Sequence, residues 1–288
     1  MNTIVSGMQP ANAELQEVER LAQARMRRRK ILVYGLRFFV LVAVLGGWEI
    51  AGRMAWIDPF FFSMPSQIAD QIWQWSIEGT AQGPLWTQIL VTLEETVLGF
   101  LIGAVAGIVA GIALGRNKLL ADIFSLYIKI ANSVPRVVLG SVFILAFGLG
   151  MASKVALAVV MVFFVVFGNA FQGVVEADRN LIANAHILGA SKRQVTFSVV
   201  LPSAMTWILA SLHVSFGFAL VGAVVGEFLG SRQGIGLLIA TAQGAFNAAG
   251  VFAAMIVLAV VALAAEYLLT ALENRLLKWR PPQFGDNH

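Results

Sequence analysis

The sequence contains no cysteine, only three histidines and few charged residues for its length. Without cysteine there is no disulfide framework, and the three scattered histidines (His186, His213 and His288) leave no credible transition-metal site. Charged residues make up 12% of the 288 residues, whereas they are roughly a quarter of a soluble domain. With 58% hydrophobic residues and a mean hydropathy of +0.79, the chain is predicted to be a membrane protein.

Motifs of catalysis are missing as well. The chain has no G-x-x-x-x-G-K-[ST] loop for ATP and no G-x-S-x-G nucleophile elbow. Gly234-Ile235-Gly236 is not a nucleotide signature, because no strand precedes it and the third glycine is absent. We therefore expect no enzymatic activity and no cofactor bound by this chain. The basic residues cluster beside apolar runs, which indicates a membrane partner rather than nucleic acid.

Long apolar runs predict an all-α membrane protein with six transmembrane helices. Each run is long enough for a hydrocarbon core of about 30 Å. The predicted spans are 31–52, 88–114, 120–148, 155–174, 203–228 and 248–272. They lie in a transmembrane domain over 31–282, which follows a polar arm at 1–30 and precedes a short tail at 283–288.

The orientation of these spans follows from the basic residues. With the N-terminus inside, fifteen of the 20 lysines and arginines lie on the inner side and three on the outer side. The other two, Lys129 and Arg136, lie within the third predicted span. This asymmetry places both termini and the loop Glu176–Pro202 in the cytoplasm.

The loop Glu176–Pro202 begins with a predicted short helix. Asp178 is a good N-cap for it. Gly189 stands where a helix ends through a left-handed residue. Four apolar residues between them share one face at helical spacing: Leu181, Ile182, Ala185 and Leu188.

A second short helix is predicted to follow the glycine. Ser191 and Gln194 form an S-x-x-Q capping box, and Pro202 marks the end of this helix or the first turn of the next one. Two short helices joined by a glycine bend form a rigid, basic loop suited to binding a soluble partner.

Polar residues in the third and fifth predicted spans indicate a translocation path. Pro135 is expected to kink the third span. Arg136 lies deep in that span, and a buried charge of this kind defaults to a functional hypothesis. The predicted path residues are Asn132, Ser133, Arg136 and His213. For Arg136 a structural ion pair or snorkelling is the alternative, and for His213 a hydrogen-bonded structural role.

The second predicted span carries a glycine every four residues, at Gly99, Gly103, Gly107 and Gly111. Such a stripe lets another helix approach closely. The pattern leaves open whether that helix belongs to the same chain or to a second copy.

The loop Glu176–Pro202 resembles the "EAA" loop of ABC-importer permeases, which in that family docks on the ATPase, and we therefore call it the coupling loop. The residues Ala185, Gly189, Val199, Leu201 and Pro202 match its A-x3-G-x9-I-x-L-P frame. The surrounding sequence is similar to the nitrate/sulfonate/taurine branch of that family, and Glu227 with 231–236 resembles its E…G-I-G outer turn. Where the family frame usually opens with an acidic residue, this chain has Ala183.

The resemblance implies a type I ABC importer permease fold in a bacterial inner membrane. It implies two cytoplasmic P-loop ATPase subunits, a second copy of this chain, a substrate-binding protein outside and contact with membrane lipid. ATP and magnesium would bind the ATPase. The residues implied in ATPase coupling are Leu181, Ile182, Ala185, Leu188, Gly189 and Pro202, and a small anionic solute is expected.

Two other functions remain open from the residues alone. An ion-coupled secondary transporter or channel would use a charged relay made of Lys129, Arg136, His213, Glu227 and Glu266. A non-transporting membrane scaffold would need none of these charges.

Overall fold

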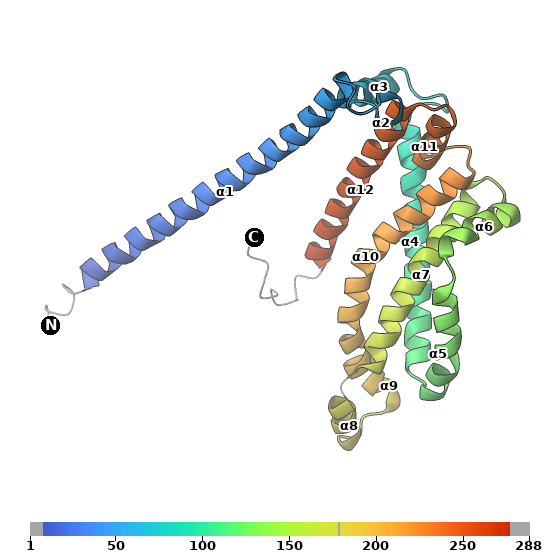
Figure 1. Ribbon diagram of the computed structural model, residues 1–288. Coiled ribbons are helices and arrows are strands. Elements are labelled where there is room, and N and C mark those ends of the chain that lie inside the picture. The colour runs from blue at the N-terminus through green and yellow to red at the C-terminus, as the bar shows by residue number, and fades with distance from the viewer. Residues whose placement is uncertain (1–7, 178, 277–288) are drawn as a thin grey trace. The chain divides into compact units, whose positions relative to one another are not determined.

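The computed structural model describes residues 8–177 and 179–276, and the regular elements of this part of the chain are helices (Figure 1). The predicted cap Asp178 and the tail 283–288 lie outside the described residues. The chain divides after Ser66 into two compact units.

The first unit consists mainly of α1 (Met8–Arg53), followed by the short α2 (Pro59–Phe62). Residues 8–30 of the predicted arm continue into the first predicted span as one unbroken helix, so the helix has no break at residue 30. Near its end, Glu49 accepts hydrogen bonds from the amide and the hydroxyl of Ser66, at 3.0 and 2.8 Å, and from Arg53 Nε at 2.8 Å. These bonds fix the chain as it leaves α1.

The second unit holds the remaining helices. Their bounds are α3 Pro65–Ile77, α4 Leu85–Gly115, α5 Lys118–Ser133, η1 Arg136–Val138, α6 Leu139–Phe147, α7 Met151–Val175, α8 Arg179–Ile187, α9 Lys192–Val195, η2 Thr196–Val200, α10 Leu201–Leu229, α11 Ile235–Gly244 and α12 Ala248–Leu276. The amphipathic α3 buries Ile68.

Among the described residues, five helices are long and apolar enough to cross a membrane, whereas six spans were predicted. The third predicted span is the exception, because it is divided into α5 and α6 instead of forming one kinked helix. Val134 and Pro135 have extended backbone angles at the division. Proline cannot donate an amide, and the residue before it is driven out of the helical region, so the helix ends here rather than bends.

Two predicted boundaries are also corrected. The fourth span was expected from residue 155, but α7 begins at Met151 and Lys154 is fully buried in its first turn. The fifth span was expected from residue 203, yet the helical run begins at Lys192. Within this run η2 is a π-helical turn directly before Pro202, with the Leu201 amide bonded to Thr196 O. The wider turn accommodates a proline that could not continue a regular helix.

The glycine stripe packs within the chain, against α7. A Cβ on Gly103, Gly107 or Gly111 would lie 2.8 to 2.9 Å from a backbone carbonyl oxygen of α7. Backbone atoms cannot move aside as a side chain can, so only glycine permits this approach. The question that the sequence left open is therefore settled in favour of packing inside one subunit.

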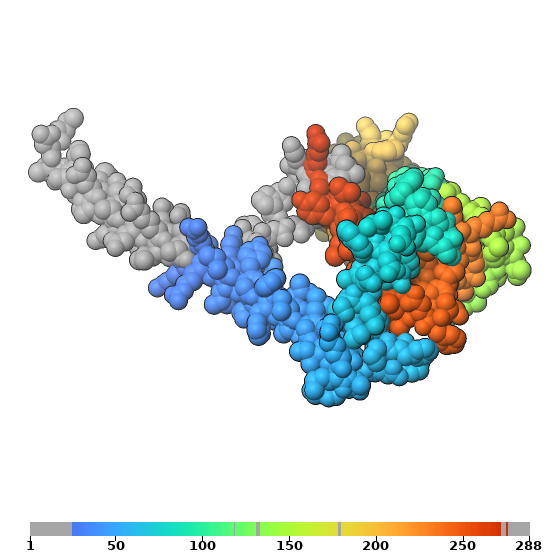
Figure 2. Space-filling view, turned by 90° about the horizontal axis from the view of Figure 1, so that it is seen from above, coloured from blue at the N-terminus to red at the C-terminus, as the bar shows by residue number. Residues whose placement is uncertain are grey.

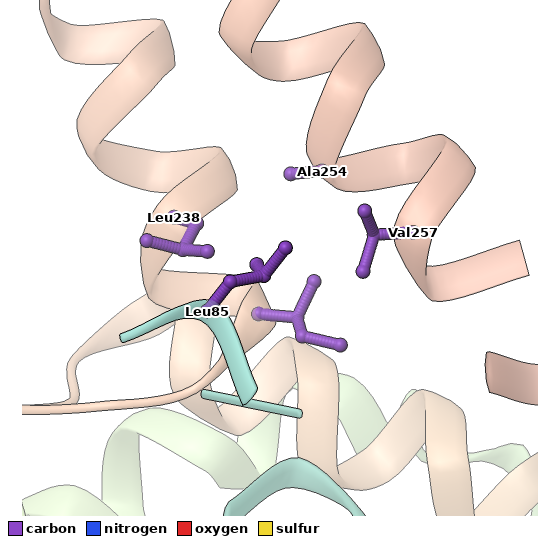
Figure 3. Packing of buried hydrophobic residues seen from close by; sticks show 5 residues of the cluster. Leu85, Leu238, Ala254 and Val257 are labelled. Carbon is purple, nitrogen blue, oxygen red and sulfur yellow. The ribbon is translucent and has the colours of Figure 1, made fainter. Parts of the chain in front are cut away.

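Apolar side chains fill the space between these helices. One cluster joins Leu85 of α4, Leu238 of α11, and Ala254 and Val257 of α12 (Figure 3). Two further clusters run down the α4–α7–α10 bundle, around Val162 and Ala204 respectively. Seen along the bundle from the end that carries the start of α4, residues of α4 lie beside the α10–α11 segment (Figure 2).

Candidate coupling loop and translocation path

Helix α8 of the coupling loop ends in a Schellman motif. Gly189 has a φ of +82°, as predicted for a left-handed residue. Its amide donates to His186 O at 2.9 Å, and the Ala190 amide donates to Ala185 O at 3.0 Å. These two bonds satisfy carbonyls that a helix end otherwise leaves unpaired.

The next helix, α9, begins with the predicted capping box. Gln194 N donates to Ser191 Oγ at 3.3 Å, and Ser191 N donates to Gln194 Oε1 at 2.8 Å. Val195 and Thr196 are buried after it, and Ala177 is buried before α8. The loop is therefore attached at both ends and stiffened in the middle.

The side chains of the loop divide into two groups. Ile182 and Ala185 are half-buried, whereas Leu181 and Leu188 are 51% and 86% exposed. Ile187 is 82% exposed, and sequence reasoning missed it because it lies off the predicted face. Its signal was the pair of bulky apolar residues directly before the glycine. Exposed apolar groups on a stiff loop mark an interaction surface.

The predicted path residues fall in two places. Arg136 follows the break between α5 and α6, and its guanidinium lies 4.9 Å from the centre of the Phe164 ring of α7. Ser133 is exposed at the end of α5, and its hydroxyl donates to Lys129 O at 3.0 Å. The side chain of Asn132 lies outside the described residues.

His213 does not join this group. It lies on α10, where its Nε2 is 3.7 Å from Glu266 Oε1 of α12. Figure 1 shows α5 and α12 on opposite sides of α10 and α7. Within one chain Arg136 and His213 therefore do not share a single site, and the part of the predicted path residues in transport stays a prediction.

A buried polar network, which we call the outer network, holds the turn before α11. Glu227 Oε2 accepts from the Gly236 amide at 2.6 Å, and its Oε1 accepts from Thr92 Oγ1 at 2.7 Å. Gln88 Oε1 accepts from the Gly234 amide at 2.8 Å. The sequence pointed to Glu227 and the Gly-Ile-Gly stretch but missed both partners on α4, because bonds spanning well over a hundred residues leave no local pattern.

Comparison with known proteins assigns the chain to a family. Residues 103–278, more than half of the chain, match the family "Binding-protein-dependent transport system inner membrane component". The chain belongs to this family. It is the permease subunit of a binding-protein-dependent ABC importer in the inner membrane, and ATP is hydrolysed by a separate subunit.

Curated relatives of this permease cover most of the chain. A putative aliphatic sulfonates transport permease of Bacillus subtilis is 30% identical over 84% of this chain and 85% of its own length. The taurine transport system permease of Escherichia coli is 29% identical over 83% and 87%. The formylaminopyrimidine transport permease of Halalkalibacterium halodurans is 28% identical over 85% and 95%.

Solved structures show the same fold. The methionine ABC transporter MetNI, in an inward-facing conformation, matches with a TM-score of 0.57 at 18% identity, over 67% of this chain and 96% of that chain. An amino acid ABC transporter matches with a TM-score of 0.53 at 17% identity, over 67% and 92%. The permease therefore has the ABC importer permease fold, and its family implies an ATPase and a binding protein as partners. Membership also replaces the ion-coupled transporter and the scaffold as explanations.

Proposed function

We propose that two copies of this permease enclose a substrate path and that each coupling loop docks in one of two cytoplasmic ATPase subunits. The observation that carries this proposal is the exposed apolar group Leu181, Ile187 and Leu188 on a loop stiffened by two caps. Ile182, Ala185, Gly189 and Pro202 position this surface. Because Ala183 replaces the acidic residue of the family frame, apolar packing carries the docking.

We further propose that α5 and α6 together complete a sixth crossing, with both termini in the cytoplasm. Their 16 and 9 residues give about 24 and 14 Å of helix. The sum exceeds the ~30 Å hydrocarbon core, so the pair is long enough. A broken helix is tolerated in a membrane where it lines a cavity or is covered by protein. The break at Pro135 supports a place for it beside the path.

The proposed substrate is a small anion. Arg136 at the break supplies the positive charge, and Asn132 and Ser133 stand next to it in sequence. Two of the relatives named above are described as sulfonate and taurine permeases. ATP and magnesium would be held by the ATPase, and this chain would bind no cofactor.

Native mass spectrometry tests the assembly. The tagged permease is purified from its host in mild detergent, and the masses that accompany it are measured. Two copies of this chain with two copies of a P-loop ATPase are expected. A monomer or homo-oligomer without ATPase, in several mild detergents, would contradict the docking.

Uptake assays test the charge of the substrate. Arg136→Gln removes a charged partner for an anion, so we expect uptake to fall by roughly tenfold while assembly is retained. Arg232→Gln, at an exposed arginine near the start of α11, is the matched control. Unchanged uptake in Arg136→Gln would make Arg136 a structural residue.

A further inference from the structure

Three ionisable side chains meet inside the bundle, and one of them, Glu227, belongs to the outer network. Glu95 comes from α4, Lys154 from the first turn of α7 and Glu227 from the last turn of α10. Their exposed fractions are 2%, 0% and 0%. Lys154 lies close enough to interact electrostatically with both carboxyl groups. Charges buried this deeply are costly unless they balance and are hydrogen-bonded.

Lys154 supplies one positive charge to this cluster. Its Nζ donates to Leu149 O at 2.8 Å, to Gly150 O at 3.2 Å and to Ser153 Oγ at 3.2 Å. An ammonium group has three hydrogens and no acceptor, so three oxygen acceptors match the charged form. One cation therefore faces two carboxyl groups.

Glu227 is the acceptor of the carboxyl pair. The Gly236 amide binds one oxygen and the Thr92 hydroxyl binds the other. Thr92 Oγ1 accepts from the Ile235 amide at 2.9 Å, so its single hydrogen is free to be donated. Thr92 Oγ1 lies 2.7 Å from Glu227 Oε1 and 3.1 Å from Gln88 O, and the shorter distance favours Glu227 as the acceptor of this hydrogen. Both Glu227 oxygens thus receive hydrogens, as expected for a carboxylate.

Glu95 is the carboxyl that lacks such donors. It lies within hydrogen-bonding reach of Glu227. Its Oε2 is buried and has no hydrogen-bond partner among the described residues. Two carboxyl groups form a hydrogen bond only if one of them carries a hydrogen. Since Glu227 already accepts on both oxygens, that hydrogen belongs to Glu95.

We propose that Glu95 is a proton-binding site, and that its proton completes the outer network by bridging Glu95 to the Glu227 carboxylate. With the proton bound, the charges of Lys154 and Glu227 cancel; without it, the buried cluster carries a net negative charge. Glu94, the other acidic residue beside Glu95, is exposed on α4. The described residues contain no group of three or more His, Cys, Asp or Glu that could hold a metal ion, so the ligand assigned is a proton.

The proton has a structural task in this arrangement. Glu227 and Thr92 hold the amides of Gly236 and Ile235, which form the first turn of α11. Loss of the proton would place a second negative charge against Glu227 and loosen this turn. The site does not depend on the docking or on the substrate proposed above, and it goes beyond both.

Infrared spectroscopy tests the site in the purified full-length permease, kept in detergent at neutral pH. An un-ionised carboxylic acid has a carbonyl band above the amide band, and this band shifts in deuterated water. We expect such a band in the wild type, its loss in Glu95→Gln and its retention in Glu94→Gln. A wild-type spectrum without the band, or a band that persists in Glu95→Gln, would overturn the proposal.

Thermal unfolding gives an independent readout. Glutamine resembles the un-ionised acid in shape and can donate to Glu227, so Glu95→Gln should shift the unfolding midpoint by no more than about 2–4 °C. Glu227→Gln places an amide NH2 group near the Gly236 amide and the Thr92 hydroxyl, which are themselves donors. It should therefore lower the unfolding midpoint several times more than Glu95→Gln does. If Glu95→Gln fails to fold, or is destabilised as much as Glu227→Gln, Glu95 is not the protonated partner.

Discussion

In the α4–α7 interface, glycine is needed because a neighbouring backbone lies close, whereas Gly189 of the coupling loop has open space around it. A Cβ on Gly107 would lie 2.9 Å from Phe163 O, and one on Gly189 would meet no atom of the described chain within 4 Å. Gly189 is instead required by its φ of +82°. The same residue type therefore serves packing in one region and backbone direction in the other.

The two regions also differ in what covers their apolar residues. Val162, Val166 and Ala204 of the bundle are fully buried by its own helices. Ile187 and Leu188 of the coupling loop are 82% and 86% exposed, although the backbone that carries them is well capped. These three bundle residues are covered without a partner, whereas the exposed pair of the loop is covered only if a partner binds it. Substitutions in the first region should change folding, and those in the second should change binding.

Placing a large side chain in the glycine stripe should have the largest effect, and this effect should be on folding. Gly107→Leu drives a side chain into backbone atoms of α7, and overpacking costs about 1–3 kcal/mol and occasionally more, with the upper end expected where the neighbours are backbone. We expect almost no monodisperse protein after solubilisation. Gly168→Leu on α7, where a Cβ meets no described atom within 4 Å, is the control and should give nearly normal yield. Equal yields would show that α4 and α7 do not pack as described.

The second largest effect is expected from replacing Gly189 in the coupling loop, and it should appear as a loss of ATPase binding. Gly189→Val forces a β-branched residue into the left-handed region, so the bend and the surface before it are lost. We expect normal membrane insertion but no ATPase in the purified complex. Gly189→Asn is the matched variant, because asparagine tolerates this conformation, and it should retain the ATPase. Recovery of a normal complex with valine would remove the coupling role from this bend.

Removing the exposed apolar pair should weaken docking less completely. Ile187→Ser with Leu188→Ser deletes apolar contacts but leaves the Schellman bonds in place. We expect roughly a tenfold or greater loss in ATPase affinity, since each anchor of an interface contributes about 1–2 kcal/mol. The unfolding midpoint should not change, because both side chains are exposed. A drop in the midpoint with unchanged affinity would assign the pair to the fold.

The smallest effect is expected at the capping box. Ser191→Ala removes the acceptor of Gln194 N and should cost about 1 kcal/mol locally. Faster amide exchange in α9, measured by mass spectrometry, should report it, while the α4–α7–α10 bundle keeps its protection. Ser191→Asp preserves the cap and should restore slow exchange.

Elements with a local code were predictable from the sequence. The capping box at Ser191 and the left-handed Gly189 were both read correctly, because caps and bends depend on residues only a few positions apart. The long apolar runs likewise predicted helices α4, α7 and α12, since a membrane span is set by length and hydropathy. The "EAA"-type frame in the coupling loop pointed to the family that the comparisons then confirmed.

Other features were settled only by the packing of distant segments. The sequence could not assign the glycine stripe to an interface, because a smooth helix face does not specify its partner. It began the fourth span only after Lys154, whereas Lys154 is buried in α7 and its ammonium group donates to two backbone carbonyls and one hydroxyl. It gave no sign that Glu95 and Glu227 meet, and only the fold brings them together from α4 and α10. Local sequence determines where helices run and how they end, while burial and charge pairing depend on which helices meet, and that is a property of the whole chain.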